Sequence, residues 1–343
     1  MGDFTFIPLW VLQDLVILGL GLAALVFIIR KEEHPESIVL ELFAFCFLYA
    51  SVYENFATLQ GWYGYGRSIL MVFNVPFSVP LVEYLVVYST LRLLEGAGAP
   101  VLARPFIAGL SGMLFDFSLD PVALRQVFAT AEGRTGRWTW YPGPADAQIY
   151  AEPVYNFTGW ILLCGYAAVF VLLGRAWQRS SGYRKAVGLA YPFLAMVASL
   201  LVLVSPLSRF LLWLWPFMDK GSVAEWIMLA ALGLAGLASV VAALLAGRRK
   251  AAGRGESGAT APGPGRRGLA ASAREEWLAL LVLAGLPMLN LAFCLGGRQW
   301  EVLWLVALGA ALEAGLAALL LSRSVGNAGS SRGVPSRSRR AGT

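Results

Sequence analysis

Long apolar stretches recur along most of this chain, and they constrain the fold more than any other feature of the sequence. A helix needs roughly 20 apolar residues to cross the hydrocarbon of a bilayer. Measured against that length, the sequence predicts about nine membrane-spanning helices, at residues 8–29, 37–58, 69–94, 101–119, 155–175, 186–206, 222–247, 276–296 and 301–322. Pro76 and Pro80 predict that the third of these is kinked or begins as a re-entrant segment. We therefore predict an all-α, polytopic integral membrane helical bundle.

The composition agrees with this fold class. Of the 343 residues, 58% are hydrophobic and 14% are charged, whereas soluble domains are about 45–50% apolar and about 25% charged. Cys46, Cys164 and Cys294 each lie in an apolar run, so we expect packed core residues rather than disulfides. The only histidine, His34, lies in a polar connection. Because haem, zinc and multi-histidine di-iron sites use imidazole ligands, we expect no such metal or cofactor.

The basic residues predict how the bundle is oriented. Of the 27 Lys and Arg residues, 20 fall in one set of alternating connections that includes the C-terminal tail, and 7 fall in the other set. Cytoplasmic connections are enriched in Lys and Arg, so we expect a multi-pass protein of the cell membrane with its N-terminus outside and its C-terminus in the cytoplasm. The net charge of +6 comes largely from positions beside apolar spans, where anionic lipid headgroups explain it. It does not indicate binding to nucleic acid.

Two stretches of biased composition divide the chain. Residues 248–275 are rich in Gly, Ala, Pro and Arg and predict a basic flexible linker, and residues 323–343, rich in Ser, Arg and Gly, predict a disordered basic tail. The linker would separate a seven-span membrane domain over residues 1–247 from a two-helix membrane extension over residues 276–322. We expect the extension to act as scaffold.

Acidic residues inside the apolar segments are the strongest indication of function. Those in the first half of the chain are Glu41, Glu54, Glu83, Asp116 and Asp120. A charged group at membrane depth costs roughly 2.5–3.5 kcal/mol on insertion scales. Asp116 and Asp120 are four residues apart, which places both on one helix face, and two close carboxyls in a dry place leave one protonated as a potential acid. Alternatively, Asp120 is solvated at a helix that Pro121 ends, and Asp116 pairs with an arginine.

The other three acids also have structural explanations. Glu83 follows Pro80 and could bind backbone groups that the proline leaves free, or a neighbouring hydroxyl. Glu54 lies near the outer end of its predicted helix and could be a solvated terminus. Glu41 lies close to the predicted cytoplasmic boundary, and for this residue we favour the structural explanation.

Aromatic side chains gather in the connections that follow or bracket these acids. The candidates for a binding site are Trp62, Tyr65, Trp138, Trp140, Tyr155 and Trp160. They form either an interfacial aromatic belt or the lining of a pocket, where their π faces would pack against a polyene and stabilise a developing cation. Asn156 lies among them, and its amide can orient water or a carboxyl because it both donates and accepts hydrogen bonds.

Several of these segments resemble a known family in their order and spacing. The blocks are Tyr53-Glu54 with residues 61–66, Val75-Pro76-Phe77-Ser78-Val79-Pro80-Leu81, residues 116–121, Trp138-Thr139-Trp140 and residues 150–160. In them the chain resembles the membrane-bound carotenoid 1,2-hydratases of the CruF type, the bisanhydrobacterioruberin hydratase-like proteins. The resemblance covers about residues 40–175. The chain departs from the family at Glu83-Tyr84, where a tryptophan-bearing stretch is usual, and at Ala151-Glu152-Pro153, where Gly-Val-Pro is usual.

The resemblance implies cofactor-free addition of water to the terminal C1–C2 double bond of an acyclic carotenoid. We expect a protonated Asp116 or Asp120 to donate to C2 and leave a tertiary cation at C1. Glu83 or Glu54 would then act as the base that orients the water, with Asn156 assisting. The expected partners are the acyclic carotenoid, the lipid bilayer and other enzymes of carotenoid biosynthesis.

Two other functions remain open at this point. The spacing of Asp116 and Asp120 is also similar to the aspartate motifs of membrane prenyltransferases, which suggests an enzyme that extends a carotenoid with a diphosphate donor. Such enzymes typically have two aspartate-rich motifs, and this chain has one such pair. The protein could also be a non-catalytic transporter or scaffold for carotenoid or another lipid, since buried carboxyls also form proton relays.

Overall fold

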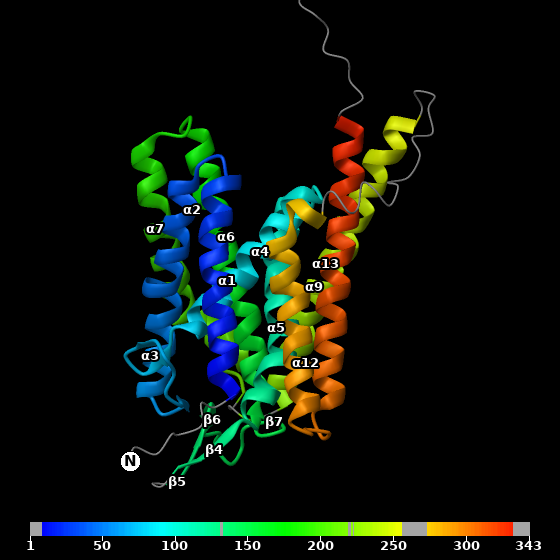
Figure 1. Ribbon diagram of the computed structural model, residues 1–343. Coiled ribbons are helices and arrows are strands. Elements are labelled where there is room, and N and C mark those ends of the chain that lie inside the picture. Colours follow the sequence, from blue (N-terminus) through cyan, green and yellow to red (C-terminus); the bar gives the residue numbers. More distant parts are fainter. Residues whose placement is uncertain (1–8, 131–132, 219–220, 222, 256–272, 332–343) are drawn as a thin grey trace, which may run out of the picture.

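The computed structural model describes residues 9–130, 133–218, 221, 223–255 and 273–331. Its helices run side by side in one elongated bundle (Figure 1). They are α1 (Leu9–Lys31), α2 (Pro35–Ala44), η1 (Phe45–Ala50), α3 (Ser51–Leu59), α4 (Ser78–Gly96), η2 (Val101–Ala103), α5 (Arg104–Ala123), α6 (Val154–Ser180), α7 (Lys185–Leu203), α8 (Pro206–Trp213), α9 (Val223–Gly255), α11 (Trp277–Leu280), η3 (Leu281–Gly285), α12 (Leu286–Gly296) and α13 (Leu303–Ser331). Within the described part of the chain, eight helices are long and apolar enough to cross a membrane. The predicted all-α membrane bundle is confirmed.

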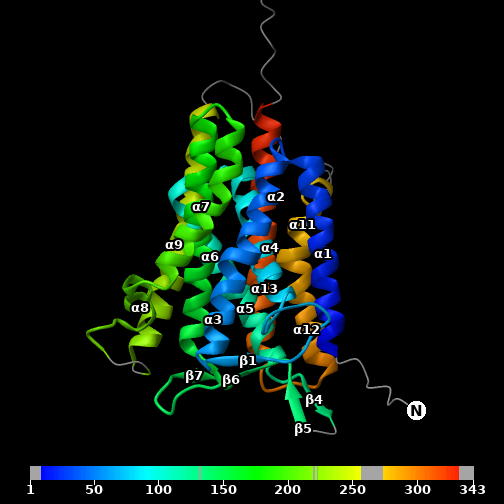
Figure 2. The same ribbon diagram turned by 90° about the vertical axis from the view of Figure 1, so that its left-hand side faces the viewer.

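The predicted span over residues 69–94 has a different structure. Residues 71–76 form a short ribbon of strands β2 (Met71–Val72) and β3 (Val75–Pro76), and α4 begins only at Ser78. Helix α4 is almost completely buried and contacts α1, α5, α6 and α13, and both views place it in the middle of the bundle (Figure 2). It carries Glu83, Arg92 and Glu95. A helix that is enclosed by other helices can hold such side chains, because it presents little surface to lipid.

Three helices continue past the ends that the sequence predicts. Helix α5 runs through Pro121 to Ala123, because a proline removes one backbone hydrogen bond but does not prevent two further helical residues at the end. Helix α9 runs to Gly255, into the predicted linker, and α13 runs to Ser331, into the predicted tail. In the extension of α9, the residues Arg248, Arg249, Lys250, Ala251 and Ala252 favour helix over coil. Of the rest of the predicted linker and tail, residues 256–272 and 332–343 lie outside the described residues, and residues 273–275 are helical.

The labelled strands gather at one end of the bundle (Figures 1 and 2). They are β1 (Tyr63–Tyr65), β4 (Val127–Thr130), β5 (Gly133–Gly136), β6 (Trp138–Trp140) and β7 (Gln148–Ile149), and β7 pairs with β8 (Glu152–Pro153). The connection between α6 and α7 lies at the opposite end (Figure 2). The three cysteines are buried and unpaired, as predicted.

Helices α12 and α13 contact α5 directly, and α13 also contacts α4. Asn290 of α12 donates a hydrogen bond to Ser118 of α5 at 3.1 Å, and Gln13 of α1 donates to Asn290. The last helices therefore share polar contacts with the helices that carry the candidate site.

Candidate functional site

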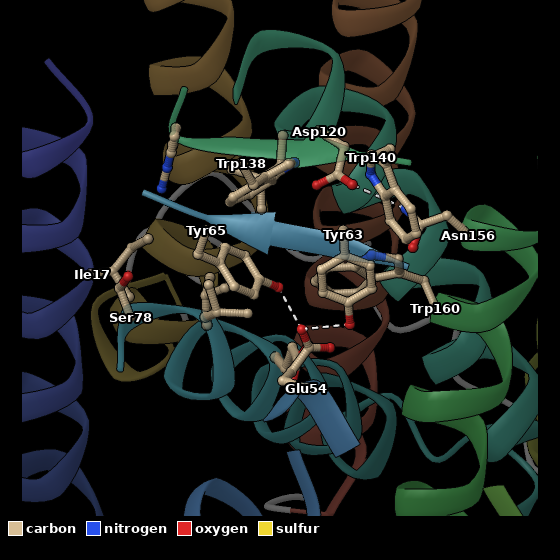
Figure 3. Close-up of a pocket in the computed structure, with 15 residues that line it drawn as sticks. Ile17, Glu54, Tyr63, Tyr65, Ser78, Asp120, Trp138, Trp140, Asn156 and Trp160 are labelled. Carbon is tan, nitrogen blue, oxygen red and sulfur yellow. Dashed lines mark hydrogen bonds between the residues drawn. The ribbon is translucent and has the colours of Figure 1, made fainter. Parts of the chain in front are cut away.

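Strands β1 and β6 form an aromatic cover over the acidic residues. They pair antiparallel, with Tyr63 opposite Trp140 and Tyr65 opposite Trp138. Because alternate residues of a strand face the same side, these four rings can share one face of the ribbon. The centroids of the Tyr63 and Trp140 rings are 4.4 Å apart, and those of Tyr65 and Trp138 are 5.6 Å apart. Figure 3 shows the rings beside Glu54 and Asp120.

Glu54 projects from α3 toward this aromatic face. The hydroxyl of Tyr63 donates to its Oε2 at 2.8 Å, and the hydroxyl of Tyr65 donates to the same oxygen (Figure 3). Glu54 is 6% exposed, so the alternative of a solvated helix end is wrong. Burial, and then the neighbouring Glu54 carboxyl, raise the pKa of Tyr63 and of Tyr65 well above the ordinary value. Both phenols therefore remain protonated and act as donors to Glu54.

Asn156, in the first turn of α6, lies among three buried carboxyls. Its Nδ2 lies 2.9 Å from Asp116 Oδ2, 3.0 Å from Asp120 Oδ2 and 2.7 Å from Glu152 Oε1. Asp116 and Asp120 do lie on one face of α5, as predicted, and neither forms an ion pair with any described residue. Since an amide has only two hydrogens for three acceptors, the cluster is better satisfied when it also holds protons of its own.

Asp116, Asp120 and Glu152 are also the one group of described acids, cysteines and histidines spaced to hold a metal ion, with one oxygen of each within 4.8 Å of the others. Carboxylate oxygens suit hard cations. However, the Asn156 amide nitrogen lies within hydrogen-bonding distance of all three, so we interpret them as a hydrogen-bonded carboxyl cluster. Burial, and then the charge of Asp120, raise the pKa of Glu152 well above the ordinary value. This favours the protonated form of Glu152.

Two cavities of different character meet beside these residues. The smaller has a volume of about 30 Å³ and is bordered by polar groups that include Asp120, Arg137 and Ser78. The larger has a volume of about 480 Å³ and extends to α7 and α8, where Leu203 and Trp213 border it. The residues that border both cavities are Glu54, Tyr63, Glu83, Trp140, Asn156 and Trp160.

The structure brings nearly all of the predicted site residues together. Asp120, Tyr65 and Trp138 border the small cavity, Trp62 and Tyr155 border the large one, and Glu54, Glu83, Asn156, Trp140 and Trp160 border both. Asp116 borders neither cavity. It accepts a hydrogen bond from Asn156, which borders both. Glu83 Oε2 is buried and has no hydrogen-bond partner among the described residues.

Several important charged residues were missed from the sequence. Asp14 of α1 and Arg137, directly before β6, form a buried ion pair with 3.0 Å between Oδ1 and Nη2. The Arg137 guanidinium also lies 5.0 Å from the centroid of the Trp138 ring. Glu152 joins the carboxyl cluster, and Glu313 is fully buried in α13, where Ser111 donates to it. Asp14 and Glu313 lie in apolar spans, so the criterion that singled out the other acids applies to them as well.

Glu41 has the structural role that we favoured from its position. Its carboxylate accepts hydrogen bonds from Arg175 Nε at 2.9 Å and Nη2 at 2.6 Å, and from the hydroxyl of Tyr191 at 2.6 Å. Both carboxylate oxygens of Glu41 therefore have hydrogen-bond donors. Glu41 borders neither cavity.

Comparisons of the chain with known protein families, with curated proteins and with solved structures find no match. The function is therefore inferred from the chemistry and geometry of these two cavities.

Proposed function

We propose that this membrane protein adds water to the terminal C1–C2 double bond of an acyclic carotenoid end group. The observation that supports this most directly is an aromatic cavity of about 480 Å³ that ends on the buried carboxyls Glu54 and Glu83, beside Asn156. Pockets of about 300–1,000 Å³ hold drug-sized ligands. Such a cavity would take one end group, and the rest of the polyene would extend toward lipid past the exposed residues Phe56 and Trp215.

The lining suits the charge that develops during hydration. Protonation of the alkene at C2 leaves a tertiary cation at C1, and the faces of tryptophan and tyrosine rings attract a cation. A buried carboxyl is a suitable acid, because removal from water favours its protonated form. Trp140, Trp160 and Tyr63 border both cavities, as the two carboxyls do.

The small cavity would supply the water. A cavity needs roughly 10–15 Å³ to hold one water molecule, together with two to four polar partners. The small cavity has about 30 Å³ and is bordered by Asp120, Asn156 and Arg137. It therefore has room for about two water molecules next to the end of the large cavity.

A direct test is to express the chain in cells that make lycopene and to analyse the pigments by mass spectrometry. The expected product carries one added water for each open end. Asp120→Asn, with Asp116→Asn as a companion, should lower its formation by about 10²–10⁴-fold if these carboxyls take part in proton transfer. Wild-type protein that yields no altered pigment would contradict the proposal, and unchanged pigment that copurifies with it would indicate a binding or transport protein instead.

A matched pair of glycine substitutions tests whether the large cavity is the binding site. Gly159 of α6 borders this cavity, and Gly233 lies on α9, outside it. At both positions, no heavy atom lies within 4 Å of the place that a Cβ would occupy. Gly159→Leu should obstruct the cavity and lower the rate of hydration about 10²-fold, since small misplacements of a substrate have effects of that size. Gly233→Leu should retain the wild-type rate. Equal activity in the two variants would exclude the large cavity as the binding site.

We also propose that the strand-bearing end faces the outside of the cell membrane. The connection between α6 and α7 lies at the opposite end (Figure 2) and carries Arg184, with the exposed Lys185 at the start of α7. Cytoplasmic connections are enriched in such residues. Because the native cysteines are buried, introduced ones can report the topology. A membrane-impermeant thiol reagent should label Ala145→Cys in intact cells and should leave Lys185→Cys unlabelled. The reverse pattern would overturn this orientation.

A further inference from the structure

The proton donor for the proposed hydration can be identified more closely, and this step depends on the proposed function. A donor must touch the carbon that it protonates. Among the described acids, only Glu54 and Glu83 border both cavities, whereas Asp120 borders only the small one and Asp116 and Glu152 border neither. An end group in the large cavity can therefore meet the carboxyl of Glu54 or of Glu83.

These two carboxyls have opposite hydrogen-bonding environments. Glu54 accepts hydrogen bonds from the Tyr63 and Tyr65 hydroxyls. Hydrogen bonds donated to a carboxylate stabilise its charged form. Glu83, by contrast, is 2% exposed, and its Oε2 has no donor among the described residues. A buried carboxyl without donors is most stable when it is neutral.

The cations near the cavities do not change this difference. Arg137 borders the small cavity, but Asp14 already pairs with it at 3.0 Å, and its side chain also donates to Gln13. Arg209 borders the large cavity from α8 and is exposed. No ion pair within the described residues includes Glu54 or Glu83. If the pair carries one negative charge, Glu54 holds it better than Glu83, because two phenols donate to Glu54 and no described group donates to Glu83 Oε2.

We infer that Glu83 is the proton donor of the hydration and that Glu54 is the carboxylate that stabilises the cation. The π electrons of the C1–C2 bond take the Glu83 proton, which forms a C–H bond at C2 and leaves Glu83 ionised. Water from the small cavity forms the C–O bond at the C1 cation and releases one proton to Asp120, which borders that cavity. The proton returns through the remaining water to Glu83, so that the net reaction is the addition of one water molecule. This assignment differs from the sequence-based expectation, in which Asp116 or Asp120 donates.

The test uses the full-length protein in detergent with an acyclic carotenoid. Glu83→Gln should lower the hydration rate by about 10²–10⁴-fold, the usual contribution of a general acid. Glu83→Ala should show the same loss, and added formate or acetate should restore part of the rate, because a small acid can occupy the space of the missing side chain. Glu313→Gln is the matched control: Glu313 is equally buried but borders neither cavity, and this variant should stay within about threefold of wild type.

A second measurement uses only the wild-type protein, so its result does not depend on whether the variants fold correctly. Hydrophobic carbodiimides react with protonated carboxyls in apolar surroundings, so mass spectrometry should find the label on Glu83 and not on Glu54. Label on Glu54 alone, or a Glu83→Gln variant that retains at least a tenth of the wild-type rate, would overturn the assignment and leave the hydratase proposal standing. A wild-type protein that forms no hydrated product would overturn both.

Discussion

The acids beside the two cavities and the acids toward the opposite end of the bundle are held by different partners. Toward the end away from the strands, Glu41 is held by Arg175 and Tyr191, and Glu32 pairs with Arg92 at 2.7 Å. Beside the two cavities, Glu54 and the cluster of Asp116, Asp120 and Glu152 receive hydrogen bonds from phenols and from one amide, and Glu83 Oε2 receives none. Glu54 is bound by tyrosine hydroxyls and Asp116 by Asn156, and no described arginine pairs with either.

This difference distinguishes acids that stabilise the fold from acids that can take part in proton transfer. An acid paired with a guanidinium in a poorly hydrated place is locked in its charged form, and removing either partner leaves an isolated charge. An acid that is bound by neutral donors can exist with or without its proton. The acids beside the two cavities are therefore able to give and accept protons, whereas Glu41, Glu32 and Asp14, which pair with arginines, serve to fix segments of the fold against one another. Substitutions that affect the two groups of acids should differ accordingly in their effect on stability.

Arg175→Met should have the largest destabilising effect on the bundle. It leaves the Glu41 carboxylate buried with only Tyr191 as a side-chain donor, and breaking a buried ion pair costs about 3–5 kcal/mol. The free energy of unfolding in detergent would measure this. Glu83→Gln provides the comparison, because a neutral amide in place of a neutral acid should change that free energy by less than about 1 kcal/mol. Similar losses in the two variants would show that the two groups of acids do not differ in this way.

The sequence predicted the helical membrane bundle well because apolar length is a local property. It also indicated the site residues, since each buried acid and each aromatic cluster can be recognised within one segment. The partners could not be predicted in the same way. Tyr63, which binds Glu54, pairs with Trp140 in a strand ribbon that joins residues far apart in the chain. Asn156 meets Asp116 and Asp120 only after α5 and α6 pack.

The errors have different physical origins. Helix α4 was predicted to start at residue 69 because apolar residues form the preceding ribbon as well as the helix. Pro121 was expected to end α5, yet the chain can remain helical for two more residues. Arg137 was counted only among the basic residues of the connections, and only the fold shows that it is buried against Asp14. Packing between distant segments decides only the case of Arg137. The other two depend on local backbone structure that apolar length and a proline do not specify.

The carboxyl cluster should make stability depend on pH through Glu152. Burial and the neighbouring Asp120 raise the pKa of Glu152 above its ordinary value of 4.5. Above about pH 4.5 the unfolded chain has released this proton while the folded protein still holds it, so the folded state binds more protons. The free energy of unfolding should therefore fall as pH rises from that value toward the raised pKa, by at most about 1.4 kcal/mol per pH unit for one group.

Glu152→Gln removes this contribution and provides the test. Unfolding in detergent, measured from pH 5 to pH 7, should show a shallower decline with pH in the variant than in the wild-type protein. Asp116 and Asp120 on α5 face the same amide of Asn156, so part of the pH dependence should remain. A slope that is unchanged by the substitution would mean that Glu152 is charged in the folded protein.

Glu301→Gln should have the smallest effect on the free energy of unfolding. It tests whether the difference between acids depends on their burial. Glu301 pairs with Arg125, but its side chain is 63% exposed. Exposed ion pairs contribute about 0–1 kcal/mol, because water solvates both charges and salt screens them. The variant should therefore unfold within about 1 kcal/mol of wild type, and added salt should reduce the difference further. A loss as large as that expected for Arg175→Met would mean that an arginine partner, rather than burial of the pair, determines how much an acid contributes to this bundle.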